Sequence, residues 1–288
     1  MSDSLSLPLE ISHDQIDPLI LEVVRKIDEV ARKHETDYFL AGATAREVIL
    51  RHVFGRPAGR RTLDIDFGIA VRDWEHFQTL KSALVEAGFT VHARAHQRLI
   101  YPTTPPIIVD LIPFGGVERE DRTIAWPPEE DFVMRVAGFS EAMESSVPVR
   151  LAGDLVVRVV SIPALLVLKL FAWLDRKQEK RDAPDIHTLL KEYGDAGNED
   201  RLYGEALNIL EAEGYDVEIA GARLLGGDAA VVVSADTRRR VRDILESDRE
   251  MEDLTNQIIM VSARHNPEHV RRCELLVSKL RQGFLQVP

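Results

Sequence analysis

The chain has 288 residues, of which 45% are apolar and 29% are charged, a composition typical of a globular protein with a substantial core. This composition excludes a disordered chain, a collagen and a small disulfide scaffold. The 36 basic and 48 acidic residues give a net charge of −12, so binding of a polyanion would depend on a local basic patch.

Two features bear on where the protein acts. The single cysteine, Cys273, has no partner for an intramolecular disulfide, and the first ten residues lack the basic and then apolar order of a secretory signal. We therefore expect a reduced, cytoplasmic compartment. Apolar stretches fall well short of the ~20 residues needed to cross a bilayer, so we expect no membrane partner.

The first 160 residues alternate between helix and strand patterns. In 17–33 the apolar residues recur at three- and four-residue spacing, which predicts a helix. The same reasoning, with Gly and Pro as chain breakers, predicts the remaining elements of this half. These are strands at 38–41, 63–71, 89–93, 98–101 and 107–112, helices at 45–53 and 73–87, and a hairpin over 147–160 with its turn at Gly153-Asp154.

After Pro163 the strand patterns nearly vanish and helical patterns dominate. Helices are predicted at 163–175, 182–193, 199–213, 235–247, 249–263 and 267–284. We therefore expect an α/β (α+β) domain over residues 1–160, followed by a mainly α-helical domain over residues 161–288.

The segment Leu63-Asp64-Ile65-Asp66-Phe67 alternates acidic with bulky apolar residues. Residues two apart in a strand share a face, about 7 Å apart at their Cα atoms, so both carboxylates would lie on one side. Two close carboxylates repel each other unless a cation neutralises them. Mg²⁺ (or Mn²⁺), completed by substrate phosphates, is the expected ligand. The alternative is a solvated acidic pair.

Asp110 is a single charge within the apolar strand 107–112. Because a buried charge is costly unless it is paired or bound to metal, this carboxylate needs an explanation. If its strand lies beside the Asp64–Asp66 strand, three carboxylates converge, as in sites where two metal ions act on a phosphoryl group. Asp110 would then be a general base or a metal ligand. The alternative is a core carboxylate bonded to an arginine.

A small-residue turn, Gly42-Ala43-Thr44, follows the strand 38–41 and precedes a helix. Glycine lets the backbone approach a phosphate, the Thr44 hydroxyl is a donor, and the start of the helix favours anions. Arg46, in the first turn of that helix, could reach the same phosphates, or it could lie on a solvated helix face.

The order of these motifs resembles that of the DNA polymerase β-like nucleotidyltransferase superfamily, and most closely the AbiEii-type nucleotidyltransferases, which include toxins of toxin–antitoxin and phage-defence systems. The residues that carry the resemblance are Gly42-Ala43-Thr44-Ala45-Arg46-Glu47, Asp64-Ile65-Asp66, Asp110, Lys169-Leu170-Phe171-Ala172 and Arg181-Asp182-Ala183-Pro184-Asp185-Ile186. The resemblance implies a catalytic domain with a mixed sheet. It also implies that the second half contributes Lys169 and either Asp182 or Asp185 to the cleft.

Carried over by residue, the resemblance implies that Asp64, Asp66 and Asp110 form the metal site. It implies that Gly42, Ala43 and Thr44 hold the triphosphate, and that Lys169, with Asp182 or Asp185, contributes to nucleotide placement or catalysis. The expected partners are a nucleoside triphosphate, an acceptor that includes RNA or a tRNA end, and a cognate antitoxin protein.

Lys169 also stands out by itself, because it interrupts the apolar helical stretch 165–171, where an unpaired ammonium would be costly. It could serve as a point charge on phosphate, or it could extend to water. Two basic clusters could flank a cleft that receives a triphosphate or RNA, but ordinary surface charge is the default interpretation of each. They are Arg56, Arg60 and Arg61, and Arg176, Lys177, Lys180 and Arg181, of which Arg181 is a nucleotide-binding candidate.

The first hypothesis is therefore a metal-dependent nucleotidyltransferase that moves a nucleoside monophosphate to an acceptor hydroxyl. A second hypothesis keeps the reaction but takes a small molecule, as aminoglycoside nucleotidyltransferases do, or a protein side chain as acceptor. A third is a degenerate fold that binds nucleotide or a partner without catalysis.

Overall fold

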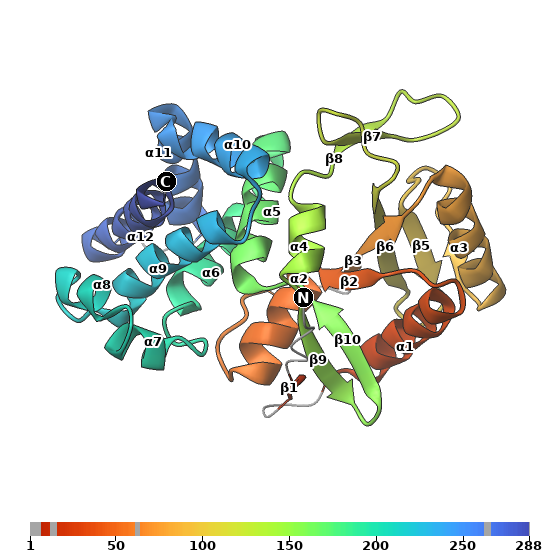
Figure 1. Ribbon diagram of the computed structural model, residues 1–288, viewed down its shortest axis with the longest axis horizontal. Coiled ribbons are helices and arrows are strands. Elements are labelled where there is room, and N and C mark those ends of the chain that lie inside the picture. The colour runs from red at the N-terminus through yellow and green to blue at the C-terminus, as the bar shows by residue number, and fades with distance from the viewer. Residues whose placement is uncertain (1–6, 12–15, 61–63, 262–265, 288) are drawn as a thin grey trace. The chain divides into compact units, whose positions relative to one another are not determined.

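The computed structural model describes residues 7–11, 16–60, 64–261 and 266–287 (Figure 1). Contacts divide the chain into two compact units. The first unit comprises residues 1–53 and 60–161, and the second comprises residues 54–59 and 162–288. Among the described helices, none is both long enough and apolar enough to span a bilayer.

The first unit is built on a mixed sheet of eight strands, in the order β1-β9-β10-β2-β3-β6-β5-β4. The pairs β1/β9, β10/β2 and β3/β6 are parallel, and the other neighbours are antiparallel. The strands are β1 (Leu9–Glu10), β2 (Tyr38–Ala41), β3 (Asp64–Val71), β4 (Thr90–Val91), β5 (Arg98–Tyr101), β6 (Ile107–Gly115), β9 (Val147–Ala152) and β10 (Leu155–Val159).

The two faces of this sheet differ in what covers them. On one face, α1 (Pro18–Lys33) and α3 (Trp74–Glu86) lie side by side (Figure 1). Tyr38 of β2 points to this face, because its ring packs on Phe67 of β3 and its hydroxyl donates to Asp28 of α1. The apolar residues of the alternating β3 pattern therefore form the core beneath the two helices.

The opposite face carries a second aromatic cluster beside the polar residues of β3. Phe139 of α4 (Phe139–Glu144) packs on Phe39 of β2 and Phe114 of β6, with ring centroids about 6 Å apart. Phe39 pairs with Gly68 and Phe114 pairs with Ala70. Residues in register share a face, so this is also the face of Asp64 and Asp66.

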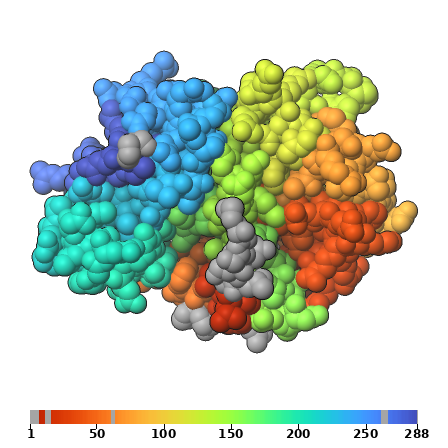
Figure 2. Space-filling model, viewed as in Figure 1, coloured from red at the N-terminus to blue at the C-terminus, as the bar shows by residue number. Residues whose placement is uncertain are grey.

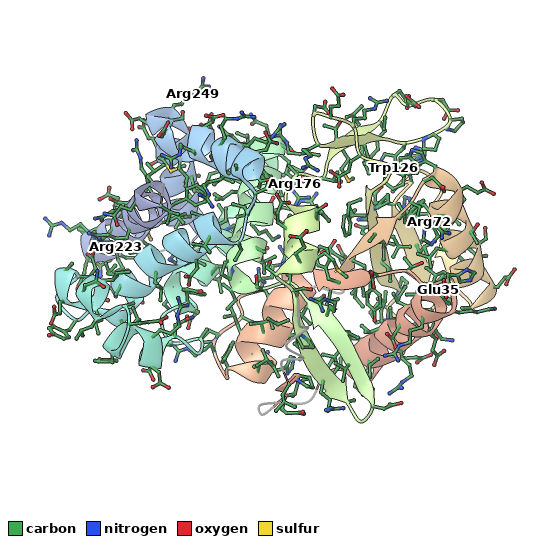
Figure 3. The ribbon with its side chains drawn as sticks, in the orientation of Figure 1. Glu35, Arg72, Trp126, Arg176, Arg223 and Arg249 are labelled. Atoms are coloured by element: carbon green, nitrogen blue, oxygen red, sulfur yellow. The ribbon has the colours of Figure 1, made fainter. Side chains whose placement is uncertain are left out.

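A short excursion after β6 forms a separate hairpin of β7 (Thr123–Ala125) and β8 (Val133–Arg135). Trp126, labelled in Figure 3, is buried where this excursion meets α3, with its ring 5.2 Å from that of Trp74 and 5.5 Å from that of Phe77. In Figure 2 the excursion forms the yellow and yellow-green part of the first unit's surface. Neither the hairpin nor α4 is predicted from the sequence.

The helix predicted at 45–53 begins earlier, at Gly42, and changes character along its length. It consists of α2 (Gly42–Arg46) and a wider π-helical segment, η1 (Glu47–Val53). The small-residue turn is therefore the first turn of the helix itself.

The second unit is helical in its described part. Its elements are α5 (Ile162–Asp175), the 3₁₀ turn η2 (Lys177–Glu179), α6 (Ala183–Glu192), α7 (Glu199–Tyr203), α8 (Leu207–Ala212), α9 (Val217–Val231), α10 (Ala235–Glu246), α11 (Asp248–Val261) and α12 (Pro267–Gln286). The helix predicted at 199–213 is thus two short helices, and α9 is not predicted at all. The α9/α12 pair forms the most extensive helix contact of this unit.

Candidate active site

A row of charged side chains crosses three neighbouring strands of the first unit. The parallel β3/β6 register places Asp66 opposite Asp110, and the antiparallel β5/β6 register places Arg98 opposite the same Asp110. Asp64 lies two residues before Asp66 on β3. Because partners in register share a face, the three carboxylates and the guanidinium lie on one face of the sheet.

Arg98 binds Asp110 through two parallel hydrogen bonds. Its Nε donates to one carboxylate oxygen at 2.8 Å and its Nη2 donates to the other at 2.7 Å. The Asp110 side chain is only 13% exposed, which makes such pairing necessary for a buried charge. The hydrogen bond to Asp110 is the main cause that raises the pKa of Arg98, and the charges of Asp64 and Asp66 raise it further.

The small-residue turn packs directly against this row. Gly42 has a φ of +63°, and a Cβ at this position would lie 1.8 Å from Oδ2 of Asp66. Only glycine therefore lets the backbone approach the Asp66 carboxylate so closely. Thr44 is buried, and its hydroxyl donates to the backbone carbonyl of Asp64 at 3.0 Å. The turn and the start of β3 are thus tied together.

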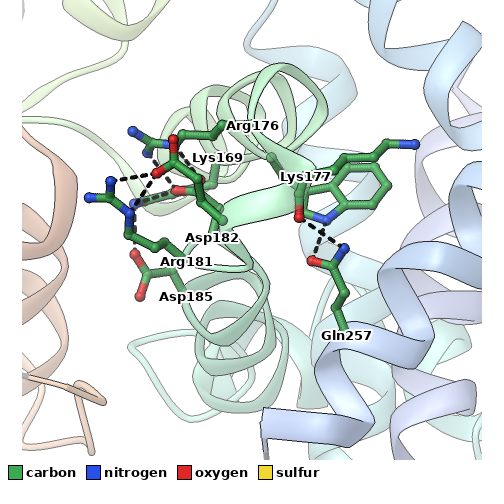
Figure 4. Close-up of polar contacts among 9 residues, drawn as sticks. Lys169, Arg176, Lys177, Arg181, Asp182, Asp185 and Gln257 are labelled. Atoms are coloured by element: carbon green, nitrogen blue, oxygen red, sulfur yellow. Dashed lines mark hydrogen bonds and ion pairs between the residues drawn. The ribbon is translucent and has the colours of Figure 1, made fainter.

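A second charged cluster lies within the helical unit (Figure 4). The Nζ atom of Lys169 on α5 lies 3.1 Å from Oδ1 of Asp182 and 2.6 Å from Oδ2 of Asp185. Asp182, immediately before α6, also accepts hydrogen bonds from Nε and Nη2 of Arg176 at 2.7 and 2.9 Å. Lys169 therefore bridges the two acids that the sequence offers as alternatives.

The environment of Asp182 keeps it ionised. Burial would by itself raise the pKa of this carboxyl, whose side chain is 2% exposed. The hydrogen bond from Arg176 and the positive charges of Lys169 and Arg176 outweigh burial and hold the pKa below its ordinary value.

The sequence as a whole identifies the family. A family profile described as "Nucleotidyl transferase AbiEii toxin, Type IV TA system" matches residues 27–257, well over half of the 288 residues. The chain belongs to the AbiEii nucleotidyltransferase family. The AbiEii match covers the turn at Gly42, the acidic row and the Lys169 cluster, and it confirms both the expected family and the expected enzyme class.

Several solved structures match this AbiEii chain in a structural comparison, at low sequence identity. The antibiotic-resistance factor ANT(2'')-Ia is 14% identical, with a TM-score of 0.40, over 69% of this chain and 99% of its own. The lincosamide antibiotic adenylyltransferase LnuA, bound to lincomycin, is 18% identical, with a TM-score of 0.35, over 61% and 98%. The Thermotoga maritima CCA-adding enzyme, complexed with tRNA, is 10% identical, with a TM-score of 0.27, over 95% and 82%. No curated protein sequence matches the chain.

The carboxylates of the AbiEii chain offer Mg²⁺ a smaller donor set than the sequence suggests. Asp64 and Asp66 present the oxygen ligands that Mg²⁺ prefers. Asp110, by contrast, has both oxygens committed to Arg98. Within the described part of the chain, no three His, Cys, Asp or Glu side chains are grouped so as to hold a metal ion. Within this row, Asp64 and Asp66 of β3 therefore present the oxygen donors that fit such an ion.

Two residues expected to contact phosphate are committed elsewhere in the structure. Arg46 is 2% exposed, and its Nη2 donates to the backbone carbonyl of Arg60 at 2.9 Å. It is therefore neither a surface ligand nor part of a solvated helix face. The Thr44 hydroxyl is engaged by Asp64, as described above, and Ala43 is half-buried beside it.

The basic clusters are partly neutralised by acids of the helical unit. Lys177 pairs with Glu250 and Asp253 of α11, Arg181 pairs with Glu179, and Arg56 pairs with Glu192 and Asp195. The Arg181 side chain is mostly exposed, as is Arg60. Arg61 and Leu63 lie outside the described residues.

Arg98 is the site residue that the sequence analysis does not single out. The signal was present, because Arg98 begins the predicted strand 98–101 and Asp110 lies within the predicted strand 107–112. An antiparallel pairing of these two strands places one opposite the other.

Proposed function

We propose that this AbiEii nucleotidyltransferase moves a nucleoside monophosphate from a nucleoside triphosphate to a hydroxyl of RNA, with a tRNA end as the preferred acceptor. The observation that carries the proposal is the position of Asp64 and Asp66 on one face of β3, against the backbone of the Gly42 turn. Carboxylates beside a turn of this kind suit a metal-bound triphosphate.

In the proposed reaction the acceptor oxygen bonds to the α-phosphorus. The bond between that phosphorus and the bridging oxygen of the pyrophosphate breaks, and pyrophosphate leaves. Both oxygens of Asp110 are occupied by Arg98, so we assign the hydroxyl proton to water and not to Asp110.

Divalent metal would supply charge neutralisation on the phosphates, with Asp64 and Asp66 as its protein ligands. The backbone of Gly42-Ala43-Thr44 would orient the triphosphate. Lys169, held by Asp182 and Asp185, would supply a point charge to the nucleotide. Residues 1–160 would thus act as the catalytic domain, and the helical domain would contribute Lys169 and its acids.

The test is incubation of the full chain with each α-labelled nucleoside triphosphate, Mg²⁺ and three acceptor pools: total RNA, aminoglycoside and lincosamide antibiotics, and total protein. We expect label at RNA ends together with equimolar pyrophosphate. Asp64→Asn and Asp66→Asn should each abolish labelling, and Asp131→Asn, at an exposed position, should not.

Label in antibiotic or protein alone would contradict the RNA acceptor but keep the reaction. Nucleotide binding without pyrophosphate release would contradict the reaction itself.

We further propose that this activity arrests growth and is opposed by an antitoxin. Induced expression of the wild-type chain should stop growth, and the Asp64→Asn variant should not. Arrest that persists with Asp64→Asn would show that toxicity does not depend on transfer.

A further inference from the structure

Arg98 lies on the strand next to Asp110, at the end of the acidic row. Its guanidinium holds both oxygens of Asp110, and Asp110 lies directly opposite Asp66 in the parallel β3/β6 register. A positive charge from the protein itself therefore already faces the acidic row.

The bond between Arg98 and Asp110 is built into the sheet. Both residues lie in regular strands. Their pairing is part of the continuous antiparallel β5/β6 register, which runs on from Arg98 opposite Asp110 to Tyr101 opposite Ile107. The Arg98 side chain is 28% exposed and that of Asp110 is 13% exposed. A planar guanidinium matched to a carboxylate at two points is well oriented and resists replacement.

A cation that used Asp110 as a ligand would need to break both of these hydrogen bonds. It would also lie beside the positive charge of Arg98, and two cations repel each other. The charges of Asp64 and Asp66 also raise the pKa of Arg98.

We propose that Arg98 takes the place of a second metal ion: it keeps Asp110 out of the metal site, so that Asp64 and Asp66 hold one divalent cation per chain. Arg98 is thus a positioning residue, which fixes the number of ions in the site and places its own charge next to them. The inference rests on the proposed function, because it assigns the metal to the Asp64–Asp66 pair.

The test measures metal binding and does not depend on turnover. The full chain is titrated with Mn²⁺, followed by electron paramagnetic resonance and by calorimetry, without nucleotide. The wild type should bind one Mn²⁺, and Asp64→Asn should weaken its affinity at least tenfold. Arg98→Gln should release Asp110 and add a second ion, and the double variant Arg98→Gln, Asp110→Asn should return to one.

Two variants separate this effect from damage to the fold. Arg98→Lys keeps the positive charge and should keep one Mn²⁺, and Arg94→Gln, at an exposed position in the preceding turn, should behave as the wild type. Circular dichroism melting checks that each variant is folded.

Two Mn²⁺ ions bound by the wild type would overturn the inference, as would an unchanged count in folded Arg98→Gln. If the wild type binds two ions and still transfers nucleotide, only this inference fails. If it binds no Mn²⁺ and transfers nothing, the proposed function fails with it.

Discussion

Gly42 is the residue through which the turn meets the acidic row. We expect Gly42→Ala to lower kcat/KM for nucleotidyl transfer by about 100-fold, because the new Cβ would displace the Asp66 carboxylate, 1.8 Å away. The positive φ adds a stability loss of about 1–2 kcal/mol.

Gly153→Ala is the matched control for this prediction. Gly153 also has a positive φ, of +52°, but a Cβ there would meet nothing within 4 Å. It should lose a similar amount of stability in urea unfolding and keep its activity. Equal activity loss in both variants would show that backbone strain, and not the contact with Asp66, is responsible.

Asp182 gives a prediction for pH dependence. Burial raises the pKa of this carboxyl, but Arg176 and Lys169 together lower the pKa by more than burial raises it. The pKa of Asp182 in the folded protein therefore lies below its value in the unfolded chain. Such a group stabilises the fold above the unfolded pKa, about 4, and this stability is lost as the pH falls through the folded pKa.

Asp182→Asn should therefore lower the free energy of unfolding at pH 7 by about 3 kcal/mol. The free energy of unfolding of the variant should also fall less steeply than that of the wild type as the pH drops below about 4. Urea unfolding at pH 7, 5 and 3 measures both effects, with Asp131→Asn as an exposed control. A variant with the same acid dependence as the wild type would contradict the assignment.

For individual residues, the sequence predicts which carboxylates share a face of the sheet, but not which side chains pair with them. Asp64 and Asp66 lie two apart in a strand, and strand geometry alone puts them together. The partner of Asp110 depends on the strand order β3-β6-β5, which is a long-range property. The sequence allows an arginine as the partner of Asp110, but no local pattern identifies Arg98 as that arginine.

Among the elements, α9 shows most clearly why periodicity sometimes fails. Its buried residues include alanines, glycines and leucines on nearly every side of the helix, so it has no polar face to mark a period. Its two adjacent glycines also favour a loop when judged from sequence. The helix forms because α12 packs closely against it, which is a tertiary effect.

We expect alanine at the two adjacent glycines of α9, Gly226 and Gly227, to change the stability of the fold in opposite directions. A Cβ on Gly226 would lie 2.3 Å from the backbone oxygen of Leu280 in α12, so Gly226→Ala should force the helices apart and cost about 1–3 kcal/mol. For Gly227 the nearest atom is 3.8 Å away, so Gly227→Ala should gain up to about 1 kcal/mol from helix propensity. Chemical denaturation of both variants checks this, and equal shifts would refute the close packing.

Other elements follow their local signals to different degrees. The long amphipathic helices α1, α3 and α12 lie close to their predicted bounds. The helix predicted at 199–213 is broken at Gly204, between α7 and α8. The short elements between 123 and 144 depend on aromatic contacts made by Trp126 and Phe139. The partners, Trp74 and Phe39, lie far away in sequence, so no local periodicity predicts these elements.

In the whole molecule, the segment 54–59 belongs to the helical unit although its flanking residues belong to the other. Arg56 anchors it, with Nε 3.0 Å from an oxygen of Glu192, whose side chain is 2% exposed, and Nη2 2.5 Å from an oxygen of Asp195. Removing the guanidinium would leave a buried carboxylate without its main counter-charge.

We expect Arg56→Met to destabilise the helical unit by about 3 kcal/mol. Hydrogen exchange should accelerate in α6, which ends at Glu192, and remain unchanged in β3. Arg60→Met, at an exposed position, serves as the control. Equal acceleration in β3 would show that the two units unfold together.

The path of the chain also limits how such a protein diversifies. The backbone passes from one unit to the other after residues 53, 59 and 161. A single recombination event near residue 161 would therefore transfer the helices without residues 54–59, which belong to the same unit. A functional chimera would need two grafts made at once. We therefore expect the two units of this enzyme to be inherited together and not to be exchanged separately between genes.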